Sequence, residues 1–264
     1  MPCDSGAVLS STRSLTTALA AARNSAAQAP WLRPITDHVL TGRALRRARI
    51  VSAVTMVAGA PVLRRAITSP SGGRQFQRWT LVLAATWTGG ALSASRLHAG
   101  YSRMPQGRVT RPVLWPLLIG VGATGVFAAG AVLTSQIRPL RERVESVVDH
   151  ARDGSLPVVV GLALVTGVTE ELFFRGALYA ALDLPVLHPV VSTTAVYTVV
   201  TCATGNPMLV FAAGLLGVVT GLDRHVTGGV QGPVIIHLTW SAGMLLVLPP
   251  LVHHFDQPRR SLVE

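Results

Sequence analysis

The chain contains one long apolar stretch that carries charged residues at its centre. Residues 156–184 read LPVVVGLALVTGVTEELFFRGALYAALDL. A helix that crosses a bilayer needs about 20 mostly apolar residues, and this stretch is long enough. Two adjacent carboxylates, Glu170 and Glu171, lie near its middle, and Arg175 follows them. Each such charge costs about 2.5–3.5 kcal/mol at the centre of a membrane helix on insertion scales. The stretch therefore predicts a membrane helix that carries a functional site.

Helical spacing separates the two carboxylates. Glu171 and Arg175 are four residues apart, so they lie on one face of the helix and are expected to form an ion pair. Glu170 is turned about 100° away from that face, where we expect it to face a cavity. A carboxylate in such a cavity is suited to take a proton from water. The Glu171–Arg175 pair alone is equally consistent with a structural role in helix packing.

Six further apolar runs lie on either side of this stretch. They cover residues 50–63, 79–95, 113–134, 186–204, 208–222 and 230–251. The pattern predicts an all-α fold, a polytopic transmembrane helix bundle of about seven spans, or eight if the N-terminal extension contributes one. We divide the chain into a polar N-terminal extension (1–43), N-terminal transmembrane helices with basic loops (44–155), an intramembrane core (156–251) and a C-terminal tail (252–264).

The composition agrees with a membrane protein. Of the 264 residues, 49% are hydrophobic and only 13% are charged, whereas soluble domains carry about 25% charged residues. The net charge is +11, and every basic residue other than histidine is arginine. Most of these arginines lie beside or between the apolar runs, which is typical of contact with anionic lipid headgroups. No nucleic-acid-binding module is recognisable. We therefore expect a multi-pass protein of the cell membrane, with membrane lipids and no nucleic acid as partners.

A second polar feature lies in the last apolar run. His237 and Ser241 are four residues apart in the sequence HLTWS, so they share a helix face. An imidazole and a hydroxyl side by side can donate hydrogen bonds to a developing oxyanion. A single histidine in a membrane helix is more often a packing residue. Its combination with the glutamate pair favours a catalytic role.

These residues resemble the motifs of the CAAX-protease and bacteriocin-processing family of intramembrane metalloproteases. Glu170, Glu171 and Arg175 match its first motif, EExxxR. His237 matches the first position of its third motif, HxxxN, and Ser241 stands where asparagine is usual. The resemblance covers residues 156–250, so it makes the predicted core a CAAX-protease-like domain.

The second family motif, FxxxH, is altered in this chain. By spacing, Tyr197 stands for the phenylalanine and Thr201 for the histidine. In the family that histidine helps the first glutamate to activate water, either directly or through a metal. A threonine hydroxyl is a poor base and a poor ligand for a transition metal. His188 and His225 lie near predicted span ends and are not convincing substitutes.

The resemblance implies an intramembrane endopeptidase that cleaves a peptide or membrane-protein substrate. Glu170 would be the general base on a water, Glu171 and Arg175 would hold the helix face, and His237 with Ser241 would stabilise the oxyanion. The residues by themselves predict no cofactor. A divalent metal such as zinc, which the resemblance allows, would need Glu170, Glu171 and His237 as ligands, and Arg175 would compete for Glu171.

Two other classes of function fit parts of the pattern. A catalytically impaired relative would use the same cavity as a membrane scaffold or peptide-binding protein, and Thr201 supports this alternative. A transporter or proton-coupled channel would also carry glutamate and arginine in its spans. The sequence lacks the paired halves with broken helices that indicate a transporter. The sequence therefore leaves two main alternatives, an active endopeptidase and a catalytically impaired relative.

Overall fold

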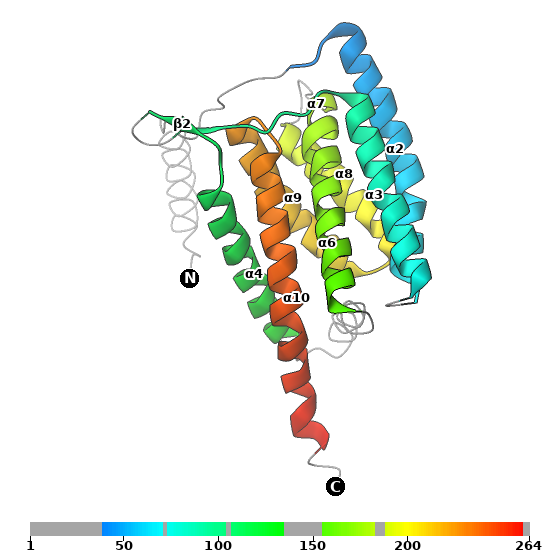
Figure 1. The fold of residues 1–264 in the computed structure, drawn as a ribbon, viewed down its shortest axis with the longest axis vertical. Coiled ribbons are helices and arrows are strands. Elements are labelled where there is room, and N and C mark those ends of the chain that lie inside the picture. The colour runs from blue at the N-terminus through cyan, green and yellow to red at the C-terminus, as the bar shows by residue number, and fades with distance from the viewer. Residues whose placement is uncertain (1–38, 71–72, 104–106, 135–154, 183–187, 261–264) are drawn as a thin grey trace, which may run out of the picture.

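The computed structural model of this chain describes residues 39–70, 73–103, 107–134, 155–182 and 188–260. The helices are α2 (Gly42–Thr68), α3 (Arg74–Ala94), α4 (Leu114–Thr134), α6 (Leu156–Glu171), α7 (Tyr179–Ala181), α8 (Pro189–Thr201), α9 (Pro207–Thr227) and α10 (Gln231–Arg260). A π-helix, η2 (Leu172–Leu178), joins α6 to α7, and a 3₁₀ turn, η3 (Cys202–Thr204), follows α8. Two short antiparallel strands, β1 (Ser102–Arg103) and β2 (Val109–Thr110), lie between α3 and α4. The predicted all-α helix bundle is confirmed (Figure 1).

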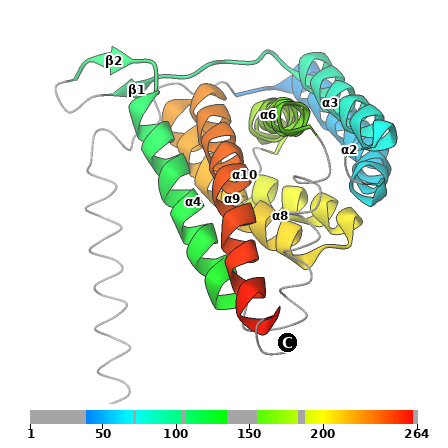
Figure 2. The ribbon, with the colours of Figure 1, turned by 60° about the horizontal axis from the view of Figure 1, so that its bottom comes forward.

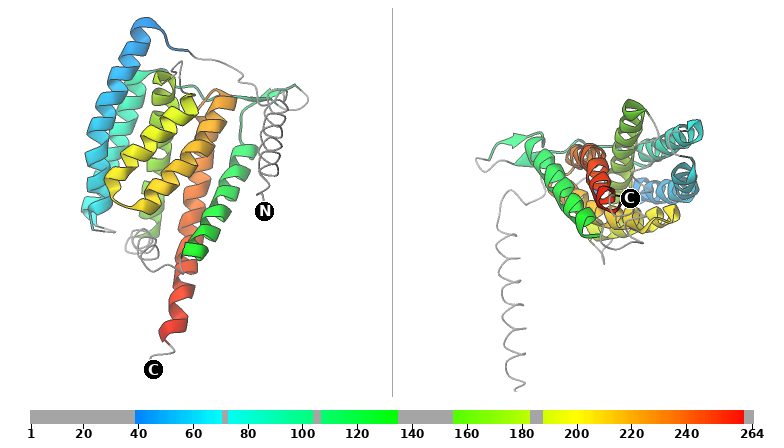
Figure 3. Two further views of the ribbon diagram at one scale, coloured as in Figure 1. Left: turned by 180° about the vertical axis from the view of Figure 1, so that it is seen from behind. Right: turned by 90° about the horizontal axis from the view of Figure 1, so that it is seen from below.

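Helix α6 lies between the other helices. Helix α2 packs along α3, α4 along α10, and α8 along α9, while α6 contacts both α3 and α10. Figure 2 shows α6 end-on, with the α2–α3 pair on one side and α10 on the other. Seen from behind, α8 and α9 cover the opposite face of the bundle, and the last turns of α10 extend past the other helices (Figure 3). The central stretch of sequence is therefore also central in space.

The described residues contain fewer candidate membrane spans than the sequence predicted. Among the described residues, four helices are long and apolar enough to cross a membrane: Gly42–Thr68, Leu114–Leu133, Pro157–Ala181 and Pro207–Thr227. Helix α3 is not among them, since its first two turns carry Arg74, Gln75, Gln77 and Arg78. The apolar helices Pro189–Thr204 and Gln231–Val247 are shorter than 18 residues. By length and composition the described residues thus give four candidate spans and not seven, because the prediction treated every apolar run as a crossing.

The predicted divisions at the chain ends fall partly outside the described residues. The extension 1–43 is described only from residue 39 onward. Residues 135–154, in the second division, and 261–264, in the predicted tail, are also outside the described part.

Helix α2 buries small residues and exposes large ones. Its buried face consists of Ala48, Ser52, Thr55, Gly59, Leu63 and Ala66. Its exposed face carries large apolar side chains such as Ile50, Val54 and Val57. In a bilayer, lipid tails are as apolar as leucine, so helices associate through close packing of small residues. This distribution fits a helix with lipid on one side and α3 on the other.

An aromatic cluster connects α3 to the segment that bears the carboxylates. Trp87 of α3 is 1% exposed and lies over Gly59, where any side chain would overlap its ring. It stacks on Phe173 of η2 with ring centroids 5.0 Å apart. Phe174 in turn contacts Tyr197 of α8 at 4.5 Å. This packing fixes the position of η2 relative to α3 and α8, and thereby the end of α6 where the glutamates lie.

Candidate active site

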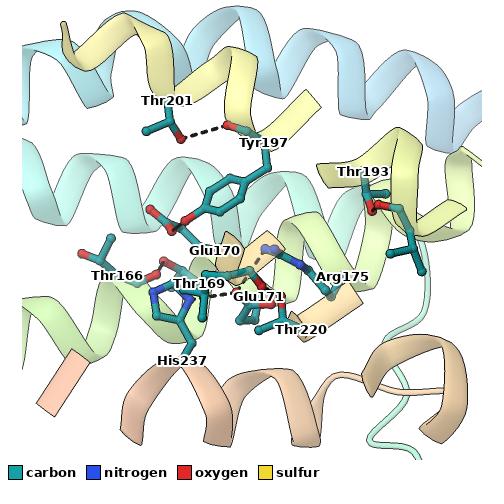
Figure 4. Close-up of polar contacts among 12 residues, drawn as sticks. Thr166, Thr169, Glu170, Glu171, Arg175, Thr193, Tyr197, Thr201, Thr220 and His237 are labelled. Atoms are coloured by element: carbon teal, nitrogen blue, oxygen red, sulfur yellow. Dashed lines mark hydrogen bonds and ion pairs between the residues drawn. The ribbon is translucent and has the colours of Figure 1, made fainter. Parts of the chain in front are cut away.

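Glu171 is held from two directions. Nη1 of Arg175 donates to Oε1 of Glu171 at 3.1 Å, and Nδ1 of His237, on α10, lies 2.8 Å from the same oxygen (Figure 4). The Glu171 and Arg175 side chains are 0% and 1% exposed. The predicted pairing of Glu171 with Arg175 is therefore present. The contact with His237 joins the first and third motifs, which are 66 residues apart.

The turn between Glu171 and Arg175 is not a regular α-helix. The π-helix η2 begins at Leu172, directly after Glu171, and includes Arg175. Single π-turns within α-helices are frequent at functional sites. The guanidinium of Arg175 lies 4.7 Å from the centre of the Tyr197 ring. Its main-chain oxygen accepts a hydrogen bond from Nε of Arg224, on α9, at 2.7 Å. Arg175 is thus fixed by contacts to three other elements.

Glu170 points away from this ion pair. Its Oε2 accepts a hydrogen bond from the hydroxyl of Tyr197 at 2.6 Å, and Figure 4 shows the two side chains meeting between α6 and α8. Glu170 and Tyr197 line a cavity of about 270 Å³ together with Thr201, His237 and Ser241. The other walls are mainly apolar and include Leu63, Phe76, Leu83, Leu162, Leu216 and Leu245. The cavity is large enough for side chains of an extended peptide, though below the usual 300–1,000 Å³ of ligand pockets.

The structure divides the five predicted site residues into two groups. Glu170, His237 and Ser241 line the cavity, whereas Glu171 and Arg175 lie behind it and do not. His237 connects the two groups. Its Nδ1 faces Glu171, and the ring edge with Cδ2 and Nε2 lies against Gly167 of α6. A Cβ at Gly167 would lie 3.2 Å from Cδ2 of the ring, so any larger residue there would have to displace the imidazole by a few tenths of an ångström.

Tyr197 is the site residue that the sequence reasoning missed. The spacing identified it only as a replacement for the phenylalanine of the second motif. The signal was available, because tyrosine differs from phenylalanine by the one hydroxyl that reaches Glu170. Thr201, one turn later, uses its own hydroxyl to donate to the main-chain oxygen of Tyr197 at 2.8 Å. The polar group that α8 presents to Glu170 is therefore the tyrosine hydroxyl.

The other two histidines considered from the sequence are elsewhere. His188 and His225 face each other with ring centroids 4.6 Å apart, and neither lines the cavity. His188 accepts a hydrogen bond from the main-chain nitrogen of Val190 and so caps the start of α8. Nδ1 of His225 lies 3.3 Å from the hydroxyl of Tyr179. They do not replace the missing histidine of the second motif.

The donor set does not fit a zinc ion. Zinc takes nitrogen and oxygen ligands at about 2.0–2.2 Å, and the best oxygen, Oε1 of Glu171, already contacts the permanent cation of Arg175. Thr201 stands where the family has a histidine. Within the described part of the chain, no three His, Cys, Asp or Glu side chains are grouped closely enough to hold a metal ion. We therefore derive no step that passes through a metal.

Comparison with known proteins found one family model that matches this core. The model of the family described as Type II CAAX prenyl endopeptidase Rce1-like matches residues 152–243. The match begins just before α6 and ends within α10, so it includes Glu170, Tyr197, Thr201, His237 and Ser241 of the cavity. This confirms the resemblance to the CAAX-protease and bacteriocin-processing family. Searches of curated proteins and of solved structures gave no match.

Proposed function

We propose that the chain is an intramembrane endopeptidase in which Glu170 activates water, because residues 152–243 match the model of the Rce1-like type II CAAX prenyl endopeptidases. The observation that carries the proposal is the position of Glu170. Its carboxylate lies in a largely apolar cavity inside the bundle, with one oxygen held by Tyr197. A positioned carboxylate next to an enclosed space is suited to general-base catalysis.

The proton transfers can be followed from the contacts of Glu170. The Tyr197 hydroxyl donates to Oε2, which leaves Oε1 to accept a proton from a water. The resulting hydroxide attacks the carbonyl carbon of the scissile peptide bond, and the carbonyl oxygen becomes an oxyanion. Glu170 then gives the proton to the leaving amine as the carbon–nitrogen bond breaks. Tyr197 is a positioning residue in this sequence of steps.

His237 and Ser241 supply the donors for the oxyanion. Nδ1 of His237 is directed at Glu171, so Nε2 is the ring nitrogen left for the substrate. It donates when the ring carries both protons. The Ser241 hydroxyl, one turn along the same wall, is the second donor. Glu171 and Arg175 orient His237 and do not touch the substrate themselves.

The walls of the cavity indicate the class of substrate. They are mainly apolar, and the cavity lies among helices of a membrane bundle. An unwound segment of a membrane protein or an apolar peptide fits this surface, because its side chains find apolar contacts. Its main-chain carbonyl can reach the donors only where it is free of helical hydrogen bonds. We propose membrane lipids and such a peptide or membrane-protein substrate as partners, and a multi-pass arrangement in the cell membrane.

A second candidate function is favoured by Thr201. Its hydroxyl donates to the main chain of α8, and threonine cannot act as the base that the family's histidine supplies. A catalytically impaired relative would bind a peptide in the same cavity as a membrane scaffold and would not cleave it.

Cleavage of a membrane-peptide library by the purified protein in lipid nanodiscs separates these two functions. We would compare the wild type with Glu170→Gln and Thr201→His by mass spectrometry of the products. Products from the wild type that disappear in Glu170→Gln support the endopeptidase. Products that form with Thr201→His but not with the wild type support the impaired relative. Products that persist in Glu170→Gln would contradict Glu170 as the base.

A further inference from the structure

A second cavity, of about 490 Å³, opens at the end of the bundle where α2 begins and α3 ends. We propose that it binds the phosphate group of an anionic ligand, in the first instance the headgroup of an anionic lipid. It is separate from the carboxylate cavity, and the two share no lining residue. The proposal does not depend on whether the protein cleaves peptides.

The lining of this cavity is basic. Arg47 of α2, Arg96 and His98 after α3, and Arg224 of α9 all line it. None of the described residues that line it is Asp or Glu. Nor, in the described ranges, does any carboxylate form an ion pair with one of these three arginines. Several positive charges around one space repel one another, and an anion between them removes that repulsion.

Main-chain contacts make the rim of the cavity rigid. Three hydrogen bonds join the segment after α3 to the α9–α10 turn: Val230 N to His98 O at 2.8 Å, Gln231 N to Ala99 O at 3.0 Å, and Tyr101 N to Thr227 O at 2.8 Å. Gly100 and Gly229 meet where the segments cross, and a Cβ on either would overlap the other's main chain. The segment that bears Arg96 and His98 is therefore fixed against the turn that follows Arg224.

Arg224 forms a fixed part of the lining. It is only 8% exposed. Its Nε donates to the main-chain oxygen of Arg175, and its guanidinium lies 4.8 Å from the centre of the Tyr179 ring. A guanidinium has five N–H donors in a planar fork, so the Nη groups remain to meet a ligand. Arg47 and Arg96 are both exposed, and both can close on the ligand from the opening.

The chemistry of the cavity favours phosphate over other anions. The arginine fork binds two phosphate oxygens at once, which gives short, charge-assisted hydrogen bonds. The cavity is wider than a phosphate alone, so it has room for the rest of a headgroup. Its position at one end of a membrane helix bundle is the level at which headgroups lie, and basic pockets between membrane helices bind anionic headgroups. Figure 1 shows the start of α2, the end of α3 and the start of α10 at this same end.

The test is a titration of the full-length protein in neutral detergent. Short-chain phosphatidylglycerol is the probe, phosphatidylcholine is the neutral headgroup control, and inorganic phosphate is the soluble source of the same group. The readouts are the thermal unfolding midpoint and the number of lipids retained in native mass spectrometry. The pocket variant is Arg47→Gln/Arg96→Gln. The matched control is Arg43→Gln/Arg46→Gln, which removes two exposed arginines from the same end of the bundle but none from the cavity.

We expect phosphatidylglycerol to raise the unfolding midpoint in a saturable way that phosphatidylcholine does not reproduce. The pocket variant should bind it about tenfold more weakly or worse, with an unchanged midpoint in its absence, and the control variant should bind as the wild type does. If inorganic phosphate saturates the same effect and blocks the lipid, the site is supported and its ligand is a soluble phosphate. Equal weakening in both variants, or no preference for the anionic lipid, would overturn the proposal.

Discussion

Glu170 and Glu171 are neighbours in the chain with different surroundings. Glu171 shares one oxygen between a guanidinium and an imidazole and does not line the cavity. Glu170 lines it and accepts a hydrogen bond from a tyrosine hydroxyl. Replacing either by glutamine removes the charge with almost no change of shape. The two amide variants are therefore a matched pair that separates folding from chemistry.

Glu171→Gln should destabilise the protein by about 3–5 kcal/mol, because it leaves the buried Arg175 charge without a carboxylate. Glu170→Gln should leave stability nearly unchanged, since the amide oxygen still accepts from Tyr197. Thermal unfolding of both variants in the same detergent measures the difference. Equal losses of stability would contradict the division of roles between the two carboxylates.

Tyr197→Phe should lower the rate of cleavage about 10- to 100-fold through kcat, because one oxygen of Glu170 loses its hydrogen bond. KM should change little, since the ring that lines the cavity remains. The double variant Tyr197→Phe/Thr201→His restores the family's FxxxH pattern and should recover activity that Tyr197→Phe lacks. Kinetics on one cleaved peptide measure all three. If Tyr197→Phe retains full activity, the tyrosine has no part in positioning Glu170.

The sequence predicted part of this site for a clear reason. The Glu171–Arg175 pair follows from the spacing of four residues, which is a local rule. The contact between Glu171 and His237 spans 66 residues. No local rule predicts such a contact, and only the family resemblance indicated that the two residues belong to one site. The Tyr197–Glu170 hydrogen bond depends on how α8 is rotated against α6. No spacing rule predicts that rotation.

At the level of elements, the least predictable feature is the π-helix. Residues 156–184 read as one continuous helix, and the structure has α6, η2 and α7 in succession. No proline marks the change within LFFRGAL. Its residues make contacts with distant elements: Phe173 and Phe174 pack against Trp87, and the main-chain oxygen of Arg175 accepts a hydrogen bond from Arg224. Hydrophobic periodicity in the sequence predicts which face of a helix is buried, but it does not predict these long-range contacts.

The pairing of α2 with α3 depends on one of two adjacent glycines. A Cβ on Gly90 would overlap Thr55 of α2, whose hydroxyl is fixed by a hydrogen bond to Val51 O at 2.7 Å. Gly89 is exposed, and a Cβ there would meet no other atom within 4 Å. Gly90→Ala should therefore destabilise the protein by about 1–3 kcal/mol, while Gly89→Ala should stabilise it by about 0.5–1 kcal/mol.

Thermal unfolding of the two glycine variants side by side is the measurement. Both substitutions gain the same helix propensity in the same turn, so their difference isolates the contact with α2. A stable Gly90→Ala protein would mean that α2 and α3 can separate without loss, contrary to the close packing described above.

At the level of the whole molecule, the crossing of Gly100 and Gly229 joins the segment after α3 to the turn before α10. The segment between α3 and α4 is bonded to the turn between α9 and α10. Gly100 has φ 86° and Gly107 has φ 80°, so alanine is strained at both. Of these two positions, only at Gly100 would the new methyl group meet another chain segment.

Gly100→Ala should therefore unfold at a lower temperature than Gly107→Ala, by about 2–4 °C for each additional kcal/mol of destabilisation in a chain of this size. The common backbone strain cancels between the two variants. Matching midpoints would show that the crossing contributes nothing beyond local conformation.

The bond between His237 and Glu171 also sets an order of events during synthesis. Arg175 emerges four residues after Glu171, but His237 emerges 66 residues later, which is roughly 3–13 s at a translation rate of about 5–20 residues per second. Throughout that interval the carboxylate has only its arginine. A nascent chain that stops before α10 therefore holds a buried carboxylate with one of its two partners missing.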